Sequence, residues 1–347
     1  MKLFSGSLAA DKGDDGIMIR VKLSTNFPEW PLIRQTPGRS GIWGECQFFI
    51  NEEIEECDFW VVYDDVIRPE TTRCPPGNTL LITGEPPSVK RYPRRYAAQF
   101  ARVLTCHREL KHPHVIYSQQ ALPWMVGCRY IREKGQWEPT YNKDYDELSG
   151  MAAVPKTKLL SVISSNKRIT PGHEQRLAFV EALKQRFGSD IDVFGRGVRD
   201  VEDKWDAIAP YRYHVVIENG QFPDYWTEKL SDAIFAGAYP LYVGCPNTGT
   251  YFAENMITSL DLTNFEGSLK AIADAIESSR YECTVQERRN AEVLLLNKYN
   301  LFAVITDCLK DSARSITAQK LTIQPSQHFV SQPLKILKDL IRPLIKR

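Results

Sequence analysis

The feature that most constrains the fold is the regular alternation of short apolar segments with helical ones in the second half of the chain. Strands are expected at 158–165, 191–195, 214–219, 239–244 and 256–262, and helices at about 172–187, 201–208, 226–236, 265–279 and 284–298. This alternation predicts parallel βαβ units and a doubly wound α/β sheet. Ligands of such sheets bind beyond the carboxyl ends of the strands, so polar residues there are the first candidates for a site.

The first half of the chain predicts a second lobe. Apolar runs indicate strands at 16–23, 46–51, 58–65 and 78–85, and the segment from 94 to 106 indicates a helix that passes into a strand. A chain of 347 residues exceeds the usual size of a single core, which favours two lobes. The polar, aperiodic stretch from about 129 to 156 is the best candidate for an interdomain connection or a mobile loop.

Composition excludes several classes of protein. The 44 Lys and Arg residues balance 43 Asp and Glu residues, so the net charge of +1 gives no overall field that would recruit nucleic acid. The eight cysteines form no CxxC pair, which is typical of reduced thiols in an intracellular protein. The N-terminus lacks the apolar core of a signal peptide, and no stretch approaches the roughly 20 apolar residues needed to span a bilayer. We expect a soluble, cytoplasmic protein.

A polar cluster follows the apolar strand that ends in VVIEN, at 215–219. A turn containing glycine and proline precedes the expected helix, whose unpaired N–H groups can bind a phosphate. Lys229, one turn into the helix, adds a positive charge, and Glu228 can accept hydrogen bonds from a sugar diol. The cluster predicts a sugar-nucleotide site. The alternative is that Thr227 and Glu228 only cap the helix, with Lys229 in solvent.

The cluster resembles the donor motif of the family 10 α1,3/4-fucosyltransferases. The matching pattern is Glu218-Asn219-x5-Tyr225-x-Thr227-Glu228-Lys229, followed by AIFAGAYPLYVG. The flanks agree, because 161–168 resembles the family's strand ending in Ser-Asn, Arg176 lies on the next helix, and 192–197 resembles the family's Gly-Arg stretch. The resemblance is continuous from about 158 to 265 and thinner in the first lobe.

The resemblance implies a bacterial-type enzyme of the glycosyltransferase B fold, in which two Rossmann-like lobes enclose an active-site cleft. It implies inverting transfer of fucose from GDP-fucose to a glycan hydroxyl, with no metal ion and no other cofactor. Residues 1–155 would form the acceptor-binding lobe and residues 156–310 the GDP-sugar donor lobe, with residues 311–347 as a C-terminal extension.

Roles for individual residues follow from the same match. Glu85, at the carboxyl end of its strand, is expected to be the catalytic base. Lys229, Tyr225 and an arginine would hold the diphosphate, and a guanidinium could do so with two hydrogen bonds. Arg196 is preferred because the Gly-Arg pair aligns most simply, and Arg199 is the alternative. Glu228 would bind the ribose. The further donor-binding residues are Asn166, Asn219 and Thr227.

Other residues of the loop and cleft have weaker assignments. Glu218 is expected to order the loop. Gly220 replaces the serine common in the family, and Phe222-Pro223 is an unusual pair there, which leaves the exact sugar open. Asp64 and Asp65 end a strand and are expected to line the acceptor cleft.

Two patterns could indicate a metal ion. Asp190-Ile191-Asp192 spells the DxD of metal-dependent glycosyltransferases, but it precedes a strand, so we interpret it as a turn and strand start. Cys106 and His107 lie near two further histidines, without a second ligand pair at zinc-like spacing. We expect no metal site.

The tail at 333–347 has leucines and isoleucines on one helical face and most of its basic residues on the other. It is either a helix that lies on an anionic membrane surface, at the inner face of the plasma membrane, or a terminal helix packed on its own domain. The predicted function is fucose transfer to the 3-hydroxyl of an N-acetylglucosamine or glucose unit in a lipopolysaccharide or capsule precursor. The alternatives are another nucleotide-sugar donor, or a glycan-binding scaffold without catalysis.

Overall fold

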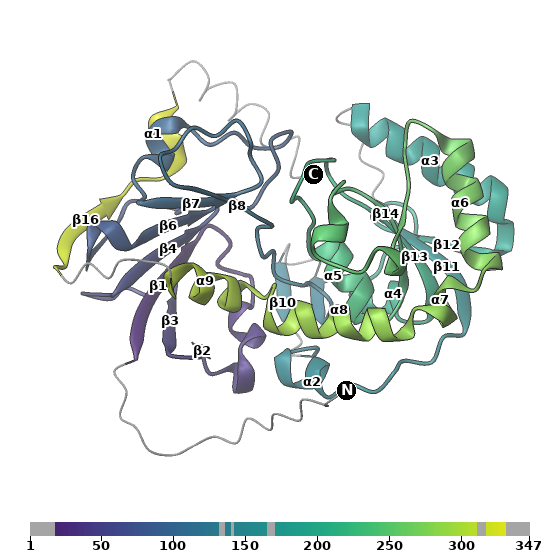
Figure 1. The fold of residues 1–347 in the computed structure, drawn as a ribbon, viewed down its shortest axis with the longest axis horizontal. Helices are drawn as coiled ribbons and strands as arrows, with labels where there is room; N and C mark the ends of the chain where they lie inside the picture. The colour runs from purple at the N-terminus through teal and green to yellow at the C-terminus, as the bar shows by residue number, and fades with distance from the viewer. Residues whose placement is uncertain (1–17, 132–135, 140–141, 165–170, 311–316, 331–347) are drawn as a thin grey trace.

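The computed structural model describes residues 18–131, 136–139, 142–164, 171–310 and 317–330. They form two α/β lobes, one drawn mainly in purple and blue and the other in teal and green (Figure 1). The expected two-lobed α/β architecture is confirmed. The helix expected at 333–347 lies outside the described residues, as does Asn166. Within the described part of the chain, no helix is long and apolar enough to cross a bilayer.

The first lobe is built on a seven-stranded sheet with the order β2-β3-β1-β4-β6-β7-β8. Neighbouring strands are parallel, except that the short β2 pairs antiparallel with β3. The carboxyl ends of the parallel strands therefore share one edge. The strands are β1 (Ile19–Thr25), β2 (Ile42–Trp43), β3 (Cys46–Ile50), β4 (Phe59–Tyr63), β6 (Thr79–Ile82), β7 (Arg102–Thr105) and β8 (Val115–Tyr117).

Both faces of this sheet are buried, as the apolar run at 59–63 predicts. Phe59, Val61 and Tyr63 belong to one core, and the intervening Trp60 and Val62 belong to the other. The helix α9 (Leu301–Lys310) packs on the first core. The helix α1 (Arg94–Ala97) and the strand β16 (Gln319–Ile323) contribute to the second.

The second lobe has a five-stranded, all-parallel sheet with the order β12-β11-β13-β14-β15. The order reverses between β11 and β13, so the crevice at their carboxyl ends is the topological switch point, where ligands of open α/β sheets bind. The polar cluster follows β13 directly. The strands are β11 (Lys158–Ile163), β12 (Ile191–Phe194), β13 (Tyr211–Ile217), β14 (Tyr239–Val243) and β15 (Thr258–Ser259).

Helices cover both faces of the second sheet (Figure 1). One core joins the sheet to α3 (Pro171–Phe187) and α6 (Phe265–Glu277), and the other joins it to α5 (Glu228–Phe235) and α8 (Val285–Asn297). The shorter α4 (Lys204–Ile208) packs against β11 and α5, and α7 (Arg280–Cys283) follows α6. The helices expected in this lobe are therefore present.

The chain returns to the first lobe after α8. Leu301, Phe302 and Ile305 of α9 belong to the core of the first lobe, and β16 pairs antiparallel with β5 (Glu70–Cys74). The packing therefore differs from the expected division at residue 310, because α9 and the described part of 311–347 complete the first lobe. An amphipathic pattern identifies a buried face but not the lobe that buries it.

The expected connection at 129–156 contains regular structure. An antiparallel hairpin of β9 (Cys128–Ile131) and β10 (Gln136–Pro139) is followed by α2 (Tyr145–Ser149). The segment lies between the two sheets, as an interdomain connection would, but these elements show that it is not a loop throughout. The sequence did not predict these elements because they are polar, and a short polar hairpin gives only a weak periodic pattern of apolar residues.

Residues 124–126 form hydrogen bonds to both lobes, and we call this segment the interlobe strap. Arg34 of the first lobe donates to the carbonyl oxygens of Trp124 (2.6 Å) and Val126 (2.8 Å). Asp232 of α5 accepts hydrogen bonds from the N–H groups of Met125 (2.8 Å) and Val126 (3.0 Å). Arg34 and Asp232 are fully buried, so the strap is bonded to each lobe by a charged group shielded from water.

Candidate active site

The polar cluster after β13 is organised by the buried carboxylate of Glu218. This carboxylate accepts hydrogen bonds from the backbone N–H (2.8 Å) and the hydroxyl (2.6 Å) of Thr227. The Thr227 side chain also caps α5, where it accepts the backbone N–H of Lys229 at 3.3 Å. Glu218 thereby ties the start of α5 to the end of β13, in agreement with the loop-ordering role expected for it.

Lys229 lies among three oxygen-bearing side chains. Its Nζ is 3.5 Å from Glu218, 3.4 Å from Glu228 and 3.3 Å from Thr227 Oγ1. Burial alone would lower the pKa of Lys229, but the two carboxylates raise it above its ordinary value. Lys229 is therefore a fixed positive charge at the N-terminus of α5, the helix end that favours anions.

Glu228 is paired with two lysines. Its carboxylate lies 3.3 Å from Lys204 of α4 and 3.4 Å from Lys229. Burial would raise the pKa of Glu228, but the two ammonium groups bring it down to about 2. The carboxylate is therefore ionised at neutral pH and suited to accept hydrogen bonds from the hydroxyl groups of a ligand.

Tyr225 and Asn219 differ in how far their side chains are exposed to solvent. Tyr225 is buried, and burial, Glu218 and Glu85 raise the pKa of its phenol, which therefore stays protonated and able to donate. Asn219 is exposed at the start of the loop. The structure thus gathers Tyr225 and the capping residues of α5 around Glu218.

Gly220 and Phe222, which both depart from the family pattern, lie next to each other in the loop. A Cβ atom at Gly220 would lie 2.6 Å from the Phe222 ring and 3.1 Å from Ser88 Oγ of the first lobe. A serine at position 220 would therefore require the Phe222 ring to move. The space beside Gly220 is filled by Phe222 and faces Ser88 of the opposite lobe.

Glu85 follows β6 in a loop whose backbone is fixed. The Tyr92 hydroxyl accepts the N–H groups of Gly84 (3.0 Å) and Glu85 (3.3 Å), and His107 Nε2 lies 2.7 Å from the Glu85 carbonyl oxygen. Tyr92 in turn donates to Asp64. These contacts hold Glu85 in position before any ligand binds.

The carboxylate of Glu85 interacts electrostatically with the second lobe. Burial is the main cause that raises its pKa, and Asp64 and Glu228 raise it further, whereas Lys229 lowers it. Because Glu228 and Lys229 belong to the second lobe, the expected base and the expected donor residues face the same interlobe region. A carboxyl group whose pKa is raised toward neutrality is suited to general base catalysis.

Asp64 and Asp65, which are expected to line the acceptor cleft, form hydrogen bonds within the first lobe and with the segment after β16. Asp64 accepts hydrogen bonds from Tyr92 and from Lys90 (2.8 Å), and Asp65 accepts the backbone N–H of Ser326 at 2.9 Å. Both aspartates are buried. Asp64 thus supports the loop of the expected base through Tyr92, and Asp65 fixes the segment after β16.

The arginines near the second-lobe crevice have different surroundings. Arg196 is exposed in the turn after β12, whereas Arg199 pairs with Asp192 (3.3 Å) and lies over the Phe194 ring. Arg176 on α3 is partly buried, and its Nε has no hydrogen-bond partner among the described residues. Burial lowers the pKa of Arg176. A buried donor without a partner is unfavourable, so an anion beside it would be stabilised.

The DxD pattern has a structural role. Asp192 lies within β12 and binds Lys158 (2.8 Å) and the Tyr211 hydroxyl (2.6 Å), while Asp190 ends the 3-10 turn before this strand. The interpretation as a turn and strand start is confirmed. In the ranges that the structure describes, no group of three or more His, Cys, Asp or Glu side chains is arranged to hold a metal ion.

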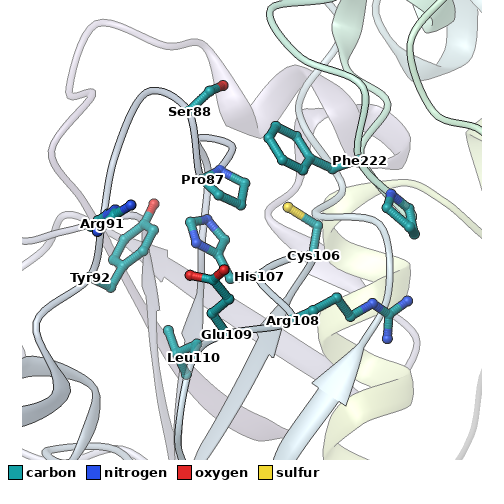
Figure 2. A pocket seen from close by; sticks show the side chains of 11 residues that line it. Pro87, Ser88, Arg91, Tyr92, Cys106, His107, Arg108, Glu109, Leu110 and Phe222 are labelled. Atoms are coloured by element: carbon teal, nitrogen blue, oxygen red, sulfur yellow. The ribbon is translucent and has the colours of Figure 1, made fainter.

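A cavity of about 470 Å³ opens between the lobes, next to the loop of Glu85 (Figure 2). Tyr92 and His107, which hold the Glu85 backbone, form part of its wall, and the second lobe contributes Phe222 and Pro223. The cavity therefore adjoins both the loop that follows the expected base and the donor loop. Its other lining residues are Pro87, Ser88, Arg91, Cys106, Arg108, Glu109 and Leu110.

An ion pair that the sequence does not predict joins the lobes at this cavity. Arg108, in the loop after β7, donates to Asp224 of the donor loop. Asp224 adopts a positive φ of 64° and also accepts hydrogen bonds from Asn247 Nδ2 (2.7 Å) and the Tyr251 hydroxyl (2.7 Å). The charge of Asp224 is thus held at the lobe interface by residues that do not lie close to it in the sequence.

Comparisons with known proteins agree with the sequence motif. Residues 153–277 match the model of "Glycosyltransferase family 10 (fucosyltransferase) C-term". An α-(1,3)-fucosyltransferase 7 of Rattus norvegicus is 27% identical over 238 residues, covering 59% of this chain and 63% of that protein. The α-(1,3)-fucosyltransferase FucT of Helicobacter pylori is 31% identical over 124 residues, covering 34% of this chain and 24% of its own length.

A crystal structure of an α1,3-fucosyltransferase with GDP has a TM-score of 0.49 and 14% identity, covering 84% of this chain and 96% of that one. The chain spans 63% of the length of the rat relative and of a similar one from Bos taurus. The matched family segment contains β11 to β15 and all of the donor-side residues described above. Residues 153–277 of the second lobe are therefore similar to the C-terminal domain of glycosyltransferase family 10, the fucosyltransferase family.

Proposed function

We propose that the protein transfers fucose from GDP-fucose to a glycan hydroxyl, with inversion at the anomeric carbon and without a metal ion. The observation that carries this proposal is the interlobe cavity, whose walls come from the loop that follows the half-buried Glu85 and from Phe222 and Pro223 of the donor loop. It supports a reaction centre between the lobes. The names of the relatives in rat and Helicobacter pylori support fucose as the sugar.

In the proposed reaction, Glu85 accepts the proton of the acceptor hydroxyl as its oxygen attacks the anomeric carbon of fucose. The bond from this carbon to the diphosphate oxygen breaks on the opposite face, and GDP departs with the electron pair. Lys229 and the protonated Tyr225 phenol would stabilise the negative charge that develops on the diphosphate. The ionised Glu228 would accept hydrogen bonds from the ribose hydroxyls, with Asn166, Asn219 and Thr227 completing the donor site.

The arginine of the donor site is proposed from its surroundings. Arg199 already pairs with Asp192, whereas the Nε of Arg176 has no partner among the described residues. Arg176 lies on α3, the helix that follows β11, and β11 is the strand beside β13 at the switch point. We therefore favour Arg176 for the diphosphate over Arg196 and Arg199.

The acceptor is proposed to present the 3-hydroxyl of an N-acetylglucosamine or glucose unit in a lipopolysaccharide or capsule precursor at the cytoplasmic face of a bacterial membrane. The charge pattern of residues 333–347 supports attachment to anionic lipid there. Removing residues 331–347 is expected to weaken binding to anionic vesicles at low salt. Equal binding with and without the tail would contradict the membrane role.

The choice of donor can be tested by thermal unfolding with GDP, UDP or CMP. A nucleotide at 100 times its dissociation constant stabilises the folded state by about 2.7 kcal/mol. We expect GDP to raise the unfolding temperature, and GDP-fucose to be consumed in EDTA when a glycan is present. Stabilisation by UDP or CMP alone would indicate another nucleotide sugar, and GDP binding without turnover on a broad glycan panel would indicate a scaffold.

A further inference from the structure

The cavity next to the Glu85 loop lies in a strongly basic segment of the chain. Residues 86–114 contain seven Lys and Arg residues and a single acidic residue, Glu109, in a chain whose net charge is only +1. Three of the six histidines lie in the same segment. The balanced composition of the whole chain therefore conceals a strongly cationic surface on the first lobe.

This surface follows two cavities that adjoin. The interlobe cavity has Arg91 on its wall, and a second cavity of about 960 Å³ has Arg94 and Lys111. Leu110 lines both cavities, so they lie next to each other on the first lobe, and we call their combined basic walls the track. No acidic residue lines the second cavity.

The cations of this track differ from the structural cations nearby. Lys90 is paired with Asp64 at 2.8 Å, and Arg108 is paired with Asp224. In contrast, Arg91, Arg94 and Lys111 are exposed, and none of them has a salt bridge to an acidic side chain in the described part of the chain. These three side chains can bind a ligand without breaking an internal ion pair.

The inner end of the track also has surfaces suited to a sugar ring. Figure 2 shows Arg91 beside the Tyr92 ring and Glu109 below His107, with Phe222 on the opposite wall. Aromatic rings provide apolar area for the C–H face of a sugar, and Ser88 and Glu109 provide polar contacts for hydroxyl groups. A volume of about 470 Å³ is sufficient for a small saccharide.

We propose that the acceptor is an anionic glycan, whose carboxylate, sulfate or phosphate groups are bound by Arg91 next to the reacting sugar and by Arg94 and Lys111 further along the track. This inference rests on the proposed glycosyl transfer. Neutral rings occupy the aromatic inner end, and the negative groups neighbouring them determine which glycans are selected. Because the arginines are exposed, the selectivity weakens as salt rises.

The test compares acceptors that differ only in charge. The panel pairs neutral lactosamine-type oligosaccharides with singly sulfated, phosphorylated or uronic-acid analogues, and kcat/KM is measured at 20 mM and 300 mM salt. We expect kcat/KM to be about tenfold higher for the best anionic analogue at low salt, the size of one charge-assisted hydrogen bond, and the ratio to shrink at high salt. Equal kcat/KM for every neutral and anionic pair would overturn the inference.

Substitutions of track residues identify the side chains that cause the preference for anionic acceptors. Arg91→Gln and the double variant Arg94→Gln/Lys111→Gln are each expected to bring the anionic-to-neutral ratio toward one. Arg68→Gln is the matched control, because it removes the same charge from an exposed arginine on the first lobe, away from both cavities. A preference that survives both track variants, or that Arg68→Gln removes equally, would contradict the assignment.

Equilibrium binding separates this inference from the proposed function. The same oligosaccharides are titrated by calorimetry with GDP present, which requires no turnover. Binding of anionic analogues that Arg91→Gln weakens supports the track even if no fucose is transferred. Transfer without charge preference supports the proposed function and contradicts the inference about the track. Tight binding to anionic vesicles through Arg91, Arg94 and Lys111, without preference among soluble glycans, also contradicts that inference.

Discussion

Glu85 combines a fixed backbone with a carboxylate that burial and its neighbours make more basic. Substituting Glu85→Gln keeps the size and the backbone contacts of the residue but removes the proton acceptor. We expect transfer to fall by at least about a hundredfold while the affinity for GDP changes little. Glu56→Gln, on the exposed surface of the same lobe, serves as the control. Unchanged turnover in Glu85→Gln would exclude Glu85 as the base.

The raised pKa of Glu85 also predicts how activity depends on pH. A base must be deprotonated to work, so kcat/KM falls as the pH drops through the pKa of Glu85. Because that pKa is raised, the acidic limb of the profile should lie above the ordinary range of a glutamate. The profile of kcat/KM between pH 4 and pH 9 checks this. An acidic limb below pH 4.5 would show that Glu85 is not the titrating base.

Arg176 is the arginine whose surroundings best suit an anionic ligand. We expect Arg176→Lys to lower kcat/KM by about a hundredfold, since a lysine cannot reproduce a two-pronged contact to phosphate. Arg199→Lys should have a smaller effect, because Arg199 is bonded to Asp192. Steady-state kinetics on both variants and on Arg196→Lys rank the three arginines. A larger loss in Arg199→Lys than in Arg176→Lys would reverse the assignment.

At the scale of elements, the start of α5 determines where Lys229 lies. Thr227→Ala removes both the cap of α5 and the hydroxyl that donates to Glu218. We expect the free energy of unfolding to fall by about 1–2 kcal/mol, and the affinity for GDP to fall with it. Thr227→Ser keeps the hydroxyl and should restore both quantities in denaturant unfolding and GDP titration. If alanine and serine behaved alike, the hydroxyl would have no such role.

The strands and most helices could be predicted because their side-chain period matches how they are buried. The run at 59–63 is apolar throughout because β4 is buried on both faces. The polar hairpin of β9 and β10 has no such pattern, and β15 is limited to Thr258–Ser259 although a strand is expected over 256–262. Pairing partners decide the length of an edge strand, and they lie far away in the sequence.

At the scale of the whole molecule, the interlobe strap connects α5 to the first lobe. Asp232→Asn removes the buried carboxylate that pairs with the half-buried Lys204, while the shape of residue 232 is kept. We expect the free energy of unfolding to fall by about 3 kcal/mol. Asp206→Asn, on the exposed side of α4, is the control in the same denaturation experiment. Equal stability of the two variants would show that the buried charge of Asp232 does not stabilise the strap.

The donor side of the site was predictable because its residues are close in sequence, whereas the opposite side required the fold. Glu218, Thr227 and Lys229 lie within one turn and its helix, so their spacing indicates their contacts. The ion pair of Arg108 and Asp224 joins residues 116 positions apart, and the Nε of Arg176 is buried without a hydrogen-bond partner among the described residues. Contacts of this kind arise from tertiary packing and have no local pattern.

The central claim is that Glu85 and the donor residues around Lys229 form one centre for fucose transfer. The most direct measurement incubates the protein with labelled GDP-fucose and a broad panel of neutral and anionic glycans in EDTA, and determines the anomeric configuration of the product by NMR. We predict labelled glycan with the configuration inverted relative to the donor, and loss of that product in Glu85→Gln. Retained configuration, or no transfer from GDP-fucose while another nucleotide sugar is consumed, would contradict the account.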